Sequence, residues 1–252
     1  MDKKRFYINT KGNDDEAYRE AMDFACKLSN ESPSIKRIIL LIHTKQNTGW
    51  FERLFGSEVV KKLFNGTHFK NCSPIFKFET KKTYDDLFEA SDIVISCGLD
   101  SEDLLKIDDF YSVQAIIAIP WLPEKLQKWV QTWNPVEIRG NQESVVSYPE
   151  PSCIVIKALE ELTNDINMST GIINPFDNEQ AKTYILALHK YESSLDENIV
   201  GAYLIRCLGW ETQHAKDIEA LIKTLNSGRH FKGGNRTSLQ HYYKAWQEKC
   251  TE

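Results

Sequence analysis

Two short apolar runs, Ile93–Ile95 and Ala115–Ile119, constrain the fold of this 252-residue chain more than any other feature. Both runs are rich in β-branched residues, and turn-forming residues follow each of them closely. Strands of a parallel sheet that are covered on both faces have this pattern, because they lack a solvent-facing side that would impose alternation. The two runs therefore predict neighbouring buried strands of a parallel sheet.

Strand-like and helix-like segments alternate on either side of these runs. This alternation predicts a Rossmann-like α/β domain over residues 1–150, with a mainly parallel sheet flanked by helices. The further strands are expected at 5–9, 37–43, 74–78 and 135–139, and the helices at 15–29, 50–64, 84–90, 102–106 and 123–133.

The pattern becomes entirely helical toward the C-terminus, which predicts a small all-α domain over residues 176–252. Asp177 and Asp196 are placed to cap the first two of its helices, and Gly209 is placed to end the second. A linker-like loop is expected at 140–152. Residues 151–175 are expected to form a connecting helix and loop, whose helix packs back on the sheet. The remaining helices are expected at 212–226 and 238–249.

Composition and charge limit the kinds of molecule that this protein is expected to bind and the compartment in which it is expected to occur. The net charge is −5, which gives no general attraction to nucleic acid or to an anionic membrane. The six cysteines are scattered, with no CxxC pair and no histidine at metal-ligand spacing. We therefore expect reduced thiols, a cytoplasmic location, no membrane segment, no metal site and no nucleic-acid partner.

The candidate site lies where the two apolar runs end. Cys97, Gly98 and Asp100 follow the first run, and Trp121 follows the second. Open α/β sheets bind ligands at the carboxyl ends of their strands, so we expect these residues to share one edge. Three of them have an alternative role: Asp100 as a helix cap, Cys97 as a small buried hydrophobe, and Trp121 as part of the core or as a contact with the helical domain.

The loop after the first predicted strand, Thr10-Lys11-Gly12, is a further candidate for ligand binding. It lacks the glycine fingerprints of dinucleotide- and phosphate-binding loops. Three acids, Asp14–Glu16, occupy the start of the following helix, where a phosphate would otherwise bind. We therefore expect helix capping here, and no standard dinucleotide site.

Arg229 stands in a glycine-rich basic turn and is a candidate contact for a phosphate or an acidic partner. The alternative is a solvated loop between two helices.

No motif is diagnostic of a known family, so three functional hypotheses remain open. The leading one is a protein that binds a small nucleotide-like ligand at the sheet edge, with the helical domain covering the site or relaying its occupancy to a partner. The second is a hydrolase- or transferase-type enzyme in the same crevice, with Cys97 or Asp100 reacting and Lys11 or Arg229 in support. The third is a protein-interaction or self-association module that uses Trp129, Trp133 or Trp246. The ligand and any cofactor stay unidentified.

Overall fold

The computed structural model describes residues 3–12, 14–46, 48–140 and 149–251. The chain divides into two compact units, Met1–Val146 and Ser147–Glu252. The first is an α/β unit and the second is helical. The predicted connecting segment, 151–175, falls within the second unit, and the predicted loop at 140–152 lies largely outside the described residues.

A six-stranded parallel sheet forms the centre of the first unit, in the order β3-β2-β4-β5-β1-β6. The prediction that the two apolar runs form neighbouring strands is confirmed, because Ile93 pairs with Ala115 and Ile95 with Ile117. The strands are β1 (Lys4–Tyr7), β2 (Arg37–Ile42), β3 (Ile75–Thr80), β4 (Asp92–Cys97), β5 (Val113–Ile119) and β6 (Val136–Glu137).

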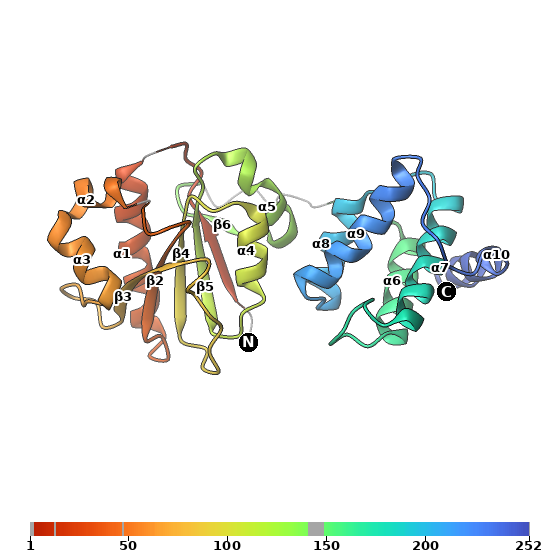
Figure 1. The fold of residues 1–252 in the computed structure, drawn as a ribbon, viewed down its shortest axis with the longest axis horizontal. Helices are drawn as coiled ribbons and strands as arrows, with labels where there is room; N and C mark the ends of the chain where they lie inside the picture. The colour runs from red at the N-terminus through yellow and green to blue at the C-terminus, as the bar shows by residue number, and fades with distance from the viewer. Residues whose placement is uncertain (1–2, 13, 47, 141–148, 252) are drawn as a thin grey trace. The chain divides into compact units, whose positions relative to one another are not determined.

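Helices cover both faces of this sheet, which gives the predicted Rossmann-like α/β fold (Figure 1). The connections after β1 and β2 place α1, α2 and α3 over one face, and those after β4 and β5 place α4 and α5 over the other. The bounds are α1 (Asp15–Glu31), α2 (Gly49–Phe55), α3 (Ser57–Asn65), α4 (Ser101–Asp108), the 3₁₀ turn η1 (Pro123–Leu126) and α5 (Gln127–Trp133).

Two predicted helices of this unit were wrong in detail. The helix predicted over 50–64 is divided into α2 and α3 at Gly56, whose φ of 84° no residue inside an α-helix adopts. The helix predicted over 84–90 does not form. Its residues follow a turn after β3 and are hydrogen-bonded to the loop between α4 and β5. Asp86 accepts hydrogen bonds from the backbone N–H groups of Tyr111 and Ser112, each at 2.8 Å.

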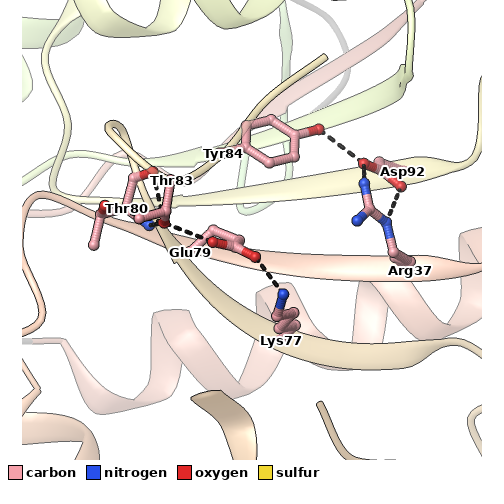
Figure 2. A network of polar contacts seen from close by, with 7 residues as sticks. All are labelled: Arg37, Lys77, Glu79, Thr80, Thr83, Tyr84 and Asp92. Atoms are coloured by element: carbon pink, nitrogen blue, oxygen red, sulfur yellow. Dashed lines mark hydrogen bonds and ion pairs between the residues drawn. The ribbon is translucent and has the colours of Figure 1, made fainter. Parts of the chain in front are cut away.

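A polar network joins the amino ends of β2 and β4 to the turn that follows β3 (Figure 2). Asp92 is fully buried, and it accepts hydrogen bonds from Arg37 Nε at 2.8 Å and from the Tyr84 hydroxyl at 3.0 Å. Thr83 donates to Glu79 at 2.6 Å, and Glu79 pairs with Lys77. The buried Asp92 carboxylate is therefore both paired and hydrogen-bonded, as a charge in a protein interior requires.

The second unit consists of five helices within the described residues, which agrees with the predicted all-helical C-terminal region. The first helix, α6, packs against α7, α10 and α8 within this unit. The bounds are α6 (Cys153–Asp165), α7 (Pro175–Tyr191), α8 (Glu197–Leu208), α9 (Thr212–Asn226) and α10 (Leu239–Lys249).

One predicted cap in this unit is wrong and one is confirmed. Asn174, and not Asp177, caps α7: its side chain accepts from the Phe176 N–H at 2.9 Å, and Pro175 takes the first helical position, where no N–H is needed. Asp196 caps α8, and Gly209 ends it in the left-handed conformation, as predicted.

The prediction of reduced cysteines is also wrong in this structure. Cys26 on α1 is bonded to Cys72, which precedes β3, and Cys153 at the start of α6 is bonded to Cys250, which follows α10. The Cα atoms lie 5.5 and 6.0 Å apart, within the usual range for a disulfide. The partners are 46 and 97 residues apart, so spacing along the chain gave no sign of the pairs.

Candidate functional site

The connections of the sheet create a crevice at its carboxyl edge. β2 and β4 are neighbours, but the loop after β2 leads to α2 on one face, and the loop after β4 leads to α4 on the other. β5 and β1 are neighbours with the same divergence. Loops that leave adjacent strands toward opposite faces open the crevice in which α/β proteins bind ligands.

A cavity of about 570 Å³ lies in this crevice. Its volume is within the range usual for sites that hold small molecules, and its wall is largely apolar and aromatic with a few polar side chains, which is the usual make-up of such a site. The lining residues are Tyr18, His43, Trp50, Cys97, Gly98, Asp100, Trp121, Leu122 and Lys125.

Three aromatic side chains from separate elements form much of the wall. Tyr18 lies on α1 and Trp50 on α2, and their ring centroids are 3.9 Å apart. Trp121 follows β5 and is 47% exposed, which is unusual for so large an apolar side chain. Aromatic surfaces of this kind stack on planar ligands.

Asp100 combines the two roles that the sequence left open. It is the N-cap of α4, with Oδ1 accepting from the Asp103 N–H at 3.1 Å, and it also lines the cavity. Within the described residues, its other carboxylate oxygen accepts no hydrogen bond. Asp100 thus offers a fixed acceptor to a ligand hydroxyl or cation.

Cys97 is a buried residue in the wall of the cavity. Its surroundings make it a poor nucleophile. Its Sγ lies 3.4 Å from the Ile95 carbonyl oxygen, and burial raises the pKa of the thiol. The thiolate is the reactive form of cysteine, so a raised pKa suppresses reaction. Burial likewise raises the pKa of Tyr18, which keeps its hydroxyl protonated.

The structure brings Cys97, Gly98, Asp100 and Trp121 together in the cavity, and places the other predicted site residues elsewhere. In the loop after β1, the Gly12 N–H donates to the Trp121 carbonyl at 2.8 Å, which holds this loop beside the wall. The Thr10 hydroxyl donates to Asp14, and Lys11 is exposed. Arg229 is exposed in the turn after α9 of the second unit.

The start of α1 is closed to an external anion, as the sequence predicted. Asp14 Oδ1 accepts from the backbone N–H groups of Glu16 and Ala17, at 3.1 and 3.0 Å. Arg139 donates to Asp14 Oδ2 at 2.6 Å, and this hydrogen bond holds the pKa of Asp14 well below its usual value.

Sequence reasoning missed five lining residues: Tyr18, His43, Trp50, Leu122 and Lys125. His43 carried a usable signal, because it is the last residue of the strand predicted at 37–43 and therefore lies at the same edge as Cys97. Tyr18 and Trp50 carried none, because their places depend on how α1 and α2 pack. Within the described residues, no group of three or more His, Cys, Asp or Glu side chains is placed to hold a metal ion.

Comparisons with known proteins bear on the second unit alone. Residues 151–247 match the model of a family described as a domain of unknown function (DUF1889), and this segment spans all five helices of that unit except the end of α10. No curated protein and no solved structure matches the chain. No helix in the described ranges has the length and apolar composition needed to cross a bilayer.

Proposed function

We propose that the α/β unit binds a small nucleotide-like ligand in the cavity at the carboxyl edge of its sheet. The observation that carries this proposal is the cavity itself, which lies between diverging loops and combines exposed Trp121 with the free oxygen of Asp100. A planar base would stack on an aromatic wall, and a ribose hydroxyl would donate to the carboxylate.

Thermal unfolding against a panel of nucleosides, nucleotides, dinucleotides and sugar phosphates tests this proposal. A ligand at about 100 times its dissociation constant adds about 2.7 kcal/mol, which raises the Tm by a few degrees. Trp121→Leu is expected to abolish the shift. Phe88→Leu is the matched control, because Phe88 is an exposed aromatic residue outside the cavity. If no compound in the panel raises the Tm, the proposal is contradicted.

The helical unit is proposed to cover the cavity or to relay its occupancy to a partner. Hydrogen exchange of α8 and α9, with and without a ligand found in the panel, tests this part. Protection that changes on ligand addition supports it, and unchanged protection throughout the helical unit opposes it.

Catalysis in the same cavity is the second candidate function, and the presence of His43 favours it. Imidazole is the side chain best suited to exchange protons near neutral pH. The pKa of Cys97 argues against thiol chemistry, so a reaction would place His43 in the role of base. Turnover of a bound ligand that is lost in His43→Asn with the fold intact would establish this function.

The Trp-based interaction surface has less support than either. Trp129 is fully buried and donates to Asp108 at 2.7 Å, and Trp246 is fully buried in the helical unit. Neither indole is accessible to a partner. Ile173 and Phe176, each 75% exposed, are the apolar side chains of the helical unit through which we would expect a partner or a second copy to bind.

We also propose a cytoplasmic location, which the two cysteine pairs make testable. Disulfides persist in oxidising compartments and are rare in the cytosol. Thiol trapping in intact cells separates the cases: reduced Cys26 and Cys72 would support a cytoplasmic location, and their disulfide would oppose it.

A further inference from the structure

Two helices that begin at the crevice, α1 and α4, are capped by aspartates. Asp14 caps α1 and Asp100 caps α4, and each carboxylate accepts from N–H groups of the first helical turn. Phosphate groups bind helix N-termini through these same N–H groups and the positive end of the helix dipole. At this crevice, the protein's own negative charges occupy that position.

The first turns of both helices add further acids. Asp15 and Glu16 lie in the first turn of α1, and Glu102 and Asp103 lie in that of α4. A ligand with several phosphates would therefore meet like charge on both sides of the crevice.

The cations near these acids are paired with them, which cancels part of the acids' charge and leaves those cations unavailable to a phosphate. Arg139 contacts Asp14 at 2.6 Å, Arg53 contacts Asp15 at 2.6 Å, and Lys81 contacts Asp103 at 3.0 Å. Lys125 is the cationic side chain among the residues that line the cavity. Within the described residues, its ammonium group makes no ion pair. One exposed lysine can neutralise part of a monophosphate, but not the charge of a triphosphate.

We infer that the cavity recognises the planar base and the hydroxyl-bearing sugar of a ribonucleoside, and discriminates against a polyphosphate tail. This inference rests on the proposed ligand site and specifies its substrate class. The base packs on the aromatic wall around Trp121, a ribose hydroxyl donates to the free oxygen of Asp100, and the 5′ position lies toward solvent and Lys125.

Calorimetric titration compares four ribonucleosides with their 2′,3′-dideoxy forms, 5′-monophosphates and 5′-triphosphates in metal-free buffer. The ribonucleoside that binds and its monophosphate are expected to agree within about threefold, because one exposed ion pair contributes little. The triphosphate and the dideoxy form are expected to bind at least about tenfold more weakly.

Asp100→Asn tests the carboxylate without removing the cap, because asparagine caps helices as well as aspartate does. It should weaken ribonucleoside binding about tenfold and reduce the penalty against the triphosphate. Asp103→Asn is the matched control: this carboxylate lies in the same helical turn but pairs with Lys81, so the ribonucleoside affinity should not change.

The two proposals fail in different ways. Triphosphates that bind tighter than the nucleoside, or dideoxy forms that bind equally well, overturn the inference while the ligand site stands. The absence of binding by every compound overturns the ligand site and the inference with it.

Discussion

The Nε2 atom of His43 lies 3.2 Å from the carbonyl oxygen of Gly98. His43 directly follows β2 and Gly98 directly follows β4, so this contact joins the two neighbouring strands where their loops diverge. Nε2 carries the proton if it donates to this carbonyl, because a carbonyl oxygen only accepts. Both residues line the cavity, so the contact forms part of its wall.

Replacing His43 by leucine should therefore loosen this wall. The Gly98 carbonyl loses its side-chain donor, and we expect the free energy of unfolding to fall by about 1 kcal/mol. Urea unfolding measures this change, with His43→Gln as the control that keeps a donor. Equal stability of the leucine variant and the wild type would contradict the role given to this contact.

Arg37→Met should destabilise the α/β unit strongly, by about 3 kcal/mol, because it leaves the buried carboxylate of Asp92 without its cation. The double variant Arg37→Met/Asp92→Asn removes the charge and keeps an acceptor for the Tyr84 hydroxyl. It should be more stable than the single variant in the same urea titration. A double variant that is less stable would show that uncompensated charge is not the main cost.

The contact between Asp14 and Arg139 predicts stability that depends on pH. The pKa of Asp14 is lower in the folded chain than in the unfolded chain, so the contact stabilises fully above the unfolded pKa of about 3.9. This contribution is lost as the pH falls below about 4. Asp14→Asn keeps the helix cap, so its stability difference from wild type should shrink on acidification, and Asp14→Ala should cost a further ~1 kcal/mol at every pH. Thermal unfolding from pH 7 to 2.5 checks both; a constant difference for Asp14→Asn would argue against the ion pair.

The six cysteines, all within the described ranges, should react in three classes. Exposed Cys207 should label in the native protein, and buried Cys97 only after unfolding. The four others should label only after reduction. Reduction should also destabilise the first unit by about 4 kcal/mol and the second by about 5 kcal/mol, from the chain entropy that each closed loop removes from the unfolded state. Mass spectrometry counts the labels, and full labelling without reductant would exclude the pairs.

The sheet and the edge that carries the cavity could be predicted from the sequence, because the signals for both lie within short segments of the chain. Fully apolar runs identified β4 and β5, and capping residues such as Asp14 and Asp196 marked where helices begin. Asp100 and Trp121 were identified from their positions after these strands, without knowledge of the strand order.

The remaining features depended on contacts that are distant in sequence. The order of strands places β1 beside β5, and no pattern within either strand specifies that pairing. Tyr18 and Trp50 meet because α1 and α2 cover the same face. In the segment that follows Tyr84, Asp86 accepts hydrogen bonds from the N–H groups of Tyr111 and Ser112 on a separate loop, and these contacts override the segment's own helical tendency.

The bond between Cys153 and Cys250 has a mechanical consequence. It joins the start of α6 to the residue that follows α10, so the helices of the second unit lie within one covalent ring. Tension applied along the chain across this ring would pass through the two sulfur atoms, and the helices would carry none of it. Cleaving the bond would release roughly 300 Å of chain to extension, so reduction would convert a short, stiff element into a long, compliant one.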